Sequence, residues 1–172
     1  MLKVLIVDDE ILVRNDLRTM IDWENHGFYI CGEAANGLQA VNLIEQQNPD
    51  IIIIDINMPQ YDGIMLSQYI HDHYKNTKMI ILSSYDNFDY VRETMKNGAT
   101  DYLLKHRMDS STLLNVLHRL KSIFYEESVK NDEIKNLVNF KNMLRPLAVD
   151  SCFRDYVYGV SNDVDSFKEQ LQ

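Results

Sequence analysis

The sequence predicts an α/β domain built on a parallel sheet, because short apolar runs alternate five times with helical patterns over about 120 residues. Two of these runs, KVLIV at 3–7 and IIII at 51–54, are continuously apolar. Such runs are typical of parallel strands that helices cover on both faces. In these sheets the ligand site lies beyond the carboxyl ends of the strands, so functional residues are expected directly after them.

Each expected element follows from its own local pattern. Clusters of β-branched and aliphatic residues predict strands at 3–7, 29–34, 51–54, 78–82 and 101–104. Apolar residues at helical spacing predict helices at 10–21, 37–47, 64–74 and 88–96. Gly27, Pro49, Pro59 and Gly63 mark the intervening loops.

From Ser110 onward the pattern is helical only. Leucines and a phenylalanine spaced by four and three residues form a seam, which suits either packing on the sheet or pairing with a second helix. The seam residues are Leu113, Leu117, Leu120 and Phe124. Arg145-Pro146 is expected to end this helix, with further helices at 146–158 and 161–171.

The charge balance narrows the function classes. The 172 residues carry 17 Lys and Arg against 26 Asp and Glu, a formal charge of −9, which disfavours nucleic acids and anionic membranes as direct ligands. No signal peptide is visible, and the longest aliphatic run, 51–54, is too short to span a bilayer. Cys31 and Cys152 follow no metal or redox spacing, which favours reduced thiols in a cytosolic protein.

Side chains suited to phosphoryl transfer follow four of the five expected strands. They are the acidic run 8–10, Asp55, Ser83 and Lys105. Carboxylates converging at one edge raise one another's pKa, and a hard cation such as Mg²⁺ relieves the repulsion. Asp55 is placed to act as a nucleophile that forms an aspartyl-phosphate, with Lys105 and a Ser83 hydroxyl to stabilise the phosphoryl oxygens. Taken singly, each residue also has an ordinary structural interpretation as a helix cap, a loop residue or a solvated lysine.

Four motifs resemble the receiver domains of two-component response regulators. They are VDDE at 7–10, DINMPQYDG at 55–63, ILSSYDNFDY at 81–90 and GATDYLLK at 98–105. The resemblance covers residues 2–124 and implies a flavodoxin-like, doubly wound (βα)5 parallel sheet with strand order 2-1-3-4-5, phosphorylated by a sensor histidine kinase. The expected organisation is a receiver domain at 1–124 followed by a helical linker at 125–172.

The resemblance implies a phospho-acceptor and a metal site. Asp55 would accept the phosphoryl group. Mg²⁺ would be bound by Asp8, Asp9, Asp55 and the backbone carbonyl of Asn57, with Asp9 the more direct ligand of the acid pair.

The resemblance also implies the residues of a switch. Lys105 would pair with the phosphoryl oxygens, the Ser83 hydroxyl would follow the phosphoryl group, and Tyr102 would turn inward behind it. His106 stands where the family usually has a proline after the lysine. Because a cis bond before a non-proline residue costs about 2.5–4 kcal/mol, a trans bond or a differently shaped loop is expected here.

The run LSSYDNFDY at 82–90 resembles the receivers of AraC-type regulators, in which a helical region precedes a helix-turn-helix domain. The chain is therefore expected to be the N-terminal part of a longer cytoplasmic regulator. It would touch DNA only through a missing C-terminal domain, and it would form a homodimer through the 88–124 face or the helical extension.

Three alternatives stay open on the sequence. A phosphatase of the haloacid dehalogenase type would need an aspartate two residues after its nucleophile, where this chain has Asn57 after Asp55 and Glu10 after Asp8. A scaffold without phosphorylation would lack part of the constellation that is complete here. A receiver joined to an output that does not bind DNA differs only in sequence beyond these residues.

Overall fold

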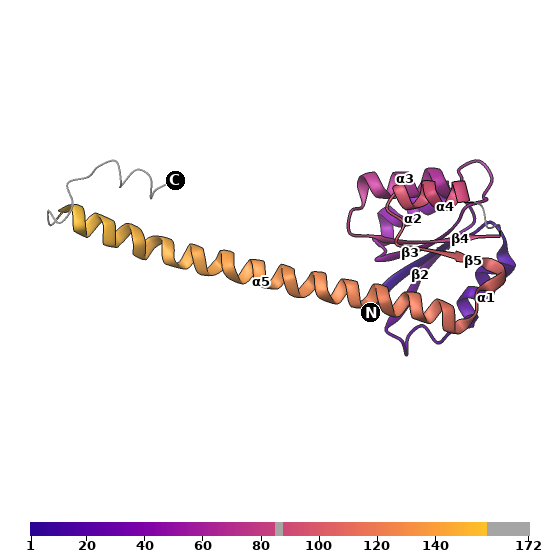
Figure 1. Ribbon diagram of the computed structural model, residues 1–172, viewed down its shortest axis with the longest axis horizontal. Coiled ribbons are helices and arrows are strands. Elements are labelled where there is room, and N and C mark those ends of the chain that lie inside the picture. The colour runs from indigo at the N-terminus through magenta and orange to yellow at the C-terminus, as the bar shows by residue number, and fades with distance from the viewer. Residues whose placement is uncertain (85–87, 158–172) are drawn as a thin grey trace. The chain divides into compact units, whose positions relative to one another are not determined.

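The computed structural model describes residues 1–84 and 88–157 (Figure 1). The chain divides into two units, Met1–Lys121 and Ser122–Gln172. The first unit contains the whole sheet and its helices, and the second contains the continuation of the last helix. Residues that could form a site at the sheet edge therefore lie in the first unit.

Strands and helices alternate along the chain as the sequence predicts. The strands are β1 (Leu2–Val7), β2 (Phe28–Ala34), β3 (Ile51–Asp55), β4 (Lys78–Ser83) and β5 (Asp101–Leu104). The helices are α1 (Ile11–Met20), α2 (Gly37–Gln47), α3 (Gly63–His73), α4 (Phe88–Lys96) and α5 (Ser110–Val157), with a 3₁₀ turn η1 (Lys105–Arg107) before α5. Sequence reasoning did not foresee η1, and it placed the start and end of α1 one residue too far out.

The five strands form one parallel sheet in the order β2-β1-β3-β4-β5. β3 lies at the centre, where every one of its residues is buried. The run IIII is explained by this position, because helices cover a central parallel strand on both faces. The flavodoxin-like order 2-1-3-4-5 is thus confirmed.

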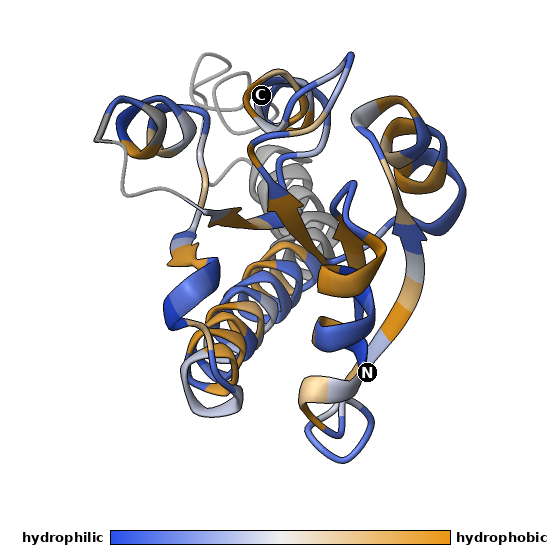
Figure 2. Ribbon diagram, turned by 90° about the vertical axis from the view of Figure 1, so that its right-hand side faces the viewer, coloured by the Kyte–Doolittle hydropathy of each residue, from blue (hydrophilic) through white to orange (hydrophobic). Residues whose placement is uncertain are grey.

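The helices form two layers around the sheet. Helices α2, α3 and α4 cover one face, and α1 and the first turns of α5 cover the other (Figures 1 and 2). In Figure 2 the strands at the centre are mostly hydrophobic, while the outer sides of the flanking helices are largely hydrophilic. On the α2–α3 side, Leu5 and Val7 of β1 pack with Ile44 and Leu66 of the helices.

One irregularity interrupts the sheet. The β1–β2 register shifts by one residue between Val4 and Leu5, so that Val4 pairs with Ile30 and Leu5 with Gly32. Cys31 is the extra residue of this bulge. Bulges of this kind are rare in parallel pairs.

The leucine seam of α5 belongs to the core of the first unit. Leu113, Leu117 and Leu120 are all fully buried within the chain. Of the two interpretations that the spacing allowed, packing on the sheet is the right one for these three leucines. Phe124 is half-buried.

The expected helix end at Arg145-Pro146 is wrong, because α5 continues to Val157. A proline inside a helix costs about 3 kcal/mol through a lost hydrogen bond and a clash, which can kink a helix without ending it. The expected last helix at 161–171 lies outside the described residues. In the part of the chain that the structure describes, no helix is long and apolar enough to cross a membrane.

Candidate functional site

The carboxyl edge of the sheet gathers the residues that sequence reasoning singled out. Asp8 follows β1, Asp55 ends β3, Ser83 ends β4, and Lys105 follows β5. Strand pairing sets Asp55 opposite Leu82 and Ser83 opposite Leu104, so the carboxyl ends of β3, β4 and β5 lie at nearly the same level of the sheet. Parallel pairing thereby brings together side chains that lie far apart in the sequence.

Lys105 is the centre of the site. Its Nζ atom lies 2.8 Å from Asp8 Oδ2, 3.2 Å from Asp55 Oδ1 and 3.3 Å from Glu10 Oε1. The Lys105 side chain is 11% exposed, and those of Asp8 and Asp55 are 0% and 3% exposed. A single ammonium group is therefore shared between two buried carboxylates and a third, more exposed one.

The buried carboxylates are only partly satisfied. Asp8 Oδ1 accepts a hydrogen bond of 2.9 Å from the Glu10 backbone N–H. Asp8 Oδ2 and Asp55 Oδ1 have ion-pair contacts with Lys105 but no well-aligned hydrogen bond within the described residues. Both oxygens could therefore accept a further cation.

The pKa values reflect this shortage of positive charge. Burial, followed by the charge of Asp8, raises the pKa of Asp55 to about 6, although Lys105 opposes the shift. Burial also raises the pKa of Asp8 against the effect of Lys105. Burial lowers the pKa of Lys105, but its contacts with Asp8 and Asp55 outweigh that effect and leave the pKa raised.

The donor set fits a hard divalent cation. The carboxylate oxygens of Asp8, Asp9 and Glu10 lie within 4.8 Å of one another. Oxygen ligands of this kind suit Mg²⁺, which binds a few carboxylates and keeps several waters. Asp55 is not part of this close group, and Asn57 lies exposed in the loop after β3. Glu10, to which sequence reasoning gave no separate role, joins the acid pair.

The loop behind Asp55 depends on Gly63. The Gly63 N–H donates to the Ile56 carbonyl at 3.0 Å, and the Asp62 side chain caps α3 by accepting from the Met65 N–H at 2.8 Å. A Cβ atom on Gly63 would collide with the Asp55 carbonyl oxygen. Sequence reasoning used Gly63 as a loop marker and as the last residue of the DINMPQYDG motif, and neither reveals this close approach.

The expected switch residues differ in their surroundings. Ser83 is fully buried, whereas Tyr102 is partly buried and packs against the core cluster on the α2–α3 side. His106 is exposed in η1, and every described peptide bond, including the one before His106, is trans. The expectation of a trans bond at the residue that replaces the family's proline is confirmed.

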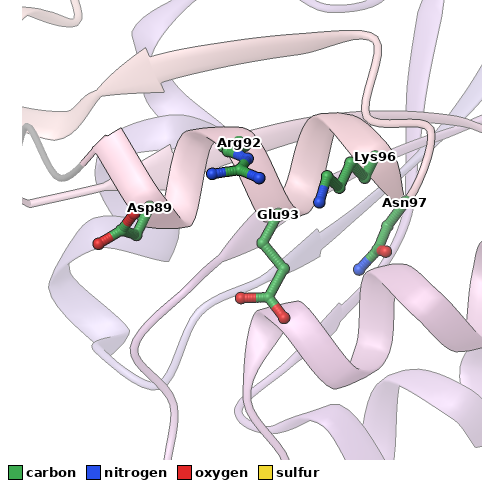
Figure 3. A pocket seen from close by; sticks show the side chains of 5 residues that line it. All are labelled: Asp89, Arg92, Glu93, Lys96 and Asn97. Atoms are coloured by element: carbon green, nitrogen blue, oxygen red, sulfur yellow. The ribbon is translucent and has the colours of Figure 1, made fainter.

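A separate pocket lies along α4. It is lined by Asp89, Arg92, Glu93, Lys96 and Asn97, whose side chains project from α4 and the residue that follows it (Figure 3). Asn97 Nδ2 donates to Ser67 Oγ at 2.9 Å and thereby connects α4 to α3. None of the residues that line this pocket belongs to the acidic site.

The comparisons with known proteins agree on one family. The family model described as response regulator receiver domain matches residues 4–118. The transcriptional regulatory protein HptR of Staphylococcus aureus (strain NCTC 8325 / PS 47) is 34% identical over 173 residues, which cover 100% of this chain and 65% of the relative. The chain thus spans somewhat less than two thirds of that relative's length.

Solved structures agree with this match. The REC domain of AraT, a response regulator from Geobacillus stearothermophilus, has a TM-score of 0.69 and 34% identity, covering 74% of this chain and 98% of its own. The two-component transcriptional regulator AraC from Clostridium phytofermentans has a TM-score of 0.65 and 28% identity, covering 76% and 99%. A chain of the CheX–CheY–BeF₃–Mg²⁺ complex from Borrelia burgdorferi has a TM-score of 0.63 and 30% identity, covering 72% of this chain and 89% of its own. The chain belongs to the receiver domain family of two-component response regulators.

Proposed function

We propose that this receiver accepts a phosphoryl group on Asp55 from a sensor histidine kinase. The observation that carries the proposal is the position of Lys105 Nζ, within 3.2 Å of Asp55 Oδ1 and 2.8 Å of Asp8 Oδ2. Phosphoryl transfer depends on positioned positive charge around the transferred group. Lys105 supplies such a charge beside the proposed acceptor.

The proposed reaction forms one bond and breaks another. A carboxylate oxygen of Asp55 attacks the phosphorus of a phosphohistidine, the O–P bond forms, and the P–N bond breaks as the histidine nitrogen leaves. Lys105 would neutralise the phosphoryl oxygens as a point charge. The protein would act as a switch whose chemistry is limited to gaining and losing its own phosphoryl group.

Receiver domains generally bind Mg²⁺ at an acidic pocket, and an acidic group is present here at Asp8, Asp9 and Glu10. We assign the metal to Asp8, Asp9 and Asp55 together with the Asn57 carbonyl. When bound, Mg²⁺ supplies electrostatic stabilisation of the phosphoryl oxygens. The unsatisfied oxygens Asp8 Oδ2 and Asp55 Oδ1 support this assignment.

The switch would then pass from the phosphoryl group to the face formed by α4, β5 and the start of α5. Ser83 is fully buried at the end of β4, and in this proposal its hydroxyl moves toward the phosphoryl group on Asp55. Tyr102 is partly buried beside the same core and could fill the space that is left. The charged side chains along α4 in Figure 3 would be displaced with this face.

The output of the switch would be transcription control. HptR is a transcriptional regulator by name, and the run at 82–90 resembles AraC-type receivers, so we infer an AraC-type DNA-binding domain beyond a helical linker at 125–172. A cytoplasmic location belongs to the same proposal. The free thiol of Cys31 is compatible with a reducing compartment.

Asp55→Asn is expected to abolish the phosphoryl adduct that acetyl phosphate and Mg²⁺ produce, because an amide cannot act as the nucleophile. Intact-protein mass spectrometry measures the adduct. Asp72→Asn is the matched control, since Asp72 is exposed on α3 and accepts only from Gln68 in the described contacts. An adduct that survives Asp55→Asn would contradict the assignment.

Phosphorylation is also expected to promote dimerisation through the helical extension. Ile134, Leu137, Val138 and Phe140 of α5 are all more than half exposed within the chain, which is unusual for large apolar side chains so close together. Sedimentation velocity with and without beryllofluoride and Mg²⁺ is expected to show a dimer only with both. Leu137→Glu should abolish it. An unchanged association state in the parent would contradict this part of the proposal.

A further inference from the structure

Arg14 binds the backbone of the acidic turn formed by residues 8–10. It lies on α1, and its Nη1 atom donates to the Asp8 carbonyl at 2.7 Å and to the Asp9 carbonyl at 3.4 Å. Its side chain is only 13% exposed. One guanidinium group therefore contacts the backbone of both members of the acid pair.

The neighbouring strand β2 fixes Arg14 in turn. Arg14 Nε lies 3.4 Å from Glu33 Oε2, and Glu33 stands next to Ala34 at the end of β2. The Asp8 N–H donates to the Ala34 carbonyl at 3.1 Å. The turn that carries the acid pair is thus fastened to α1 through a side chain and to β2 through its backbone.

We propose that Arg14 is a positioning residue for the divalent cation, an inference that rests on the proposed metal site. Carboxylates of Asp8, Asp9 and Glu10 that converge within 4.8 Å repel one another, and repulsion favours an open turn. Arg14 opposes this opening by fixing the two backbone carbonyls. The carboxylates are then already gathered when a cation arrives, so binding does not have to order them.

Positioning and simple charge predict effects of opposite sign. Arg14 is a cation near the site, so its charge alone disfavours a second cation, and its removal would tighten metal binding. If Arg14 instead positions the turn, its removal weakens binding. The direction of the change therefore separates a positioning role from a purely electrostatic one.

Arg18 provides a matched control. It pairs with the same Glu33, at 3.5 Å from Oε1, but its side chain is 54% exposed and it has no hydrogen bond to the Asp8 or Asp9 carbonyl in the described contacts. Arg18→Met removes the same charge from the same helix. It leaves the hydrogen bonds from Arg14 to the Asp8 and Asp9 carbonyls in place.

The test is Mn²⁺ binding, followed by the loss of the free-ion signal in electron paramagnetic resonance. We expect Arg14→Met to weaken binding about tenfold, the lower end of the effect seen when residues that support metal ligands are removed. Arg18→Met should stay within about twofold of the parent, as expected for an exposed charge. Circular dichroism establishes that each variant is folded at the temperature of the titration.

The outcomes are distinct. Equal or tighter binding by Arg14→Met, or equal losses in both variants, would overturn the positioning role while leaving the metal site intact. Failure of the parent to bind Mn²⁺ would overturn the metal site and this inference with it. If Arg14→Met does not fold, Arg14→Lys is the second variant, because it keeps the positive charge but replaces the guanidinium group by a single ammonium group. Weaker Mn²⁺ binding by Arg14→Lys would support the positioning role, and affinity equal to that of the parent would overturn it.

Discussion

Replacing Lys105 with methionine is expected to lower the free energy of unfolding by about 3–5 kcal/mol at neutral pH without divalent cations. The substitution conserves length and removes the ammonium group that lies 2.8 Å from Asp8 Oδ2 and 3.2 Å from Asp55 Oδ1. Both carboxylates would then be buried without a cation. Removing one partner of a buried pair is costly because the remaining charge stays out of water.

Urea unfolding followed by circular dichroism measures this loss. Lys75→Met is the control, because Lys75 is exposed beyond α3 and such surface changes alter stability by about 0.5 kcal/mol or less. Asp55→Asn in the Lys105→Met background should recover part of the loss by neutralising one of the two carboxylates. A Lys105→Met protein as stable as the Lys75→Met protein would show that the buried charges are compensated in another way.

Asp55→Asn alone should have the opposite effect and stabilise the metal-free protein by about 2–3 kcal/mol at neutral pH. The pKa of Asp55 rises from 3.8 to about 6 on folding, and one pKa unit corresponds to about 1.4 kcal/mol. The substitution removes a buried negative charge. It leaves Lys105 paired with Asp8, a balanced pair.

The raised pKa of Asp55 also determines how the stabilisation by Asp55→Asn depends on pH. A carboxyl group whose pKa is higher in the folded protein binds its proton more tightly there, so its contribution to stability is complete below about pH 4. That contribution is lost as the pH rises through about 6. Parent and Asp55→Asn should therefore be equally stable near pH 4, and the difference between their free energies of unfolding should grow up to about pH 7. Mg²⁺ should reduce this difference, because it binds and stabilises the parent.

Chemical unfolding of both proteins across this range measures the difference, in which titrations of other groups largely cancel. Asp72→Asn again serves as the control, because Asp72 is exposed on α3 and should show no such divergence. A gap that is constant with pH would mean that Asp55 does not titrate in the range inferred. A parent more stable than Asp55→Asn would mean that the attraction of Lys105 outweighs the cost of burying the Asp55 charge.

Sequence patterns predicted the fold because the relevant signals are local. The run IIII reports burial on both faces, and a functional side chain at the end of a strand reaches the carboxyl edge in any parallel sheet. The order of the strands came from the motifs of the family. Hydrophobic periodicity does not distinguish a helix that packs on its own sheet from one that pairs with a second helix, and only burial of Leu113, Leu117 and Leu120 decided the matter.

The parts of the site that sequence reasoning missed are contacts between distant segments. Lys105 meets Glu10 across 95 positions, and Arg14 meets Glu33 on another strand. The close approach of Gly63 to the Asp55 carbonyl depends on the loop between them. Pro146 was misjudged for another reason, since the cost of an internal proline is small beside the backbone hydrogen bonds that a long helix retains.

The bulge at Cys31 decides which side of the sheet Glu33 faces. With the extra residue, Glu33 pairs with Ile6 and shares its side, the side of α1 and Arg14. If the regular pairing of Val4 with Ile30 continued without this bulge, Cys31 would pair with Leu5 and Glu33 with Val7, whose side chain lies in the core under α2 and α3. Since a slip of one residue turns every side chain over, leaving Cys31 unpaired keeps the Glu33 carboxylate out of the core and within reach of Arg14, which contacts the acid pair.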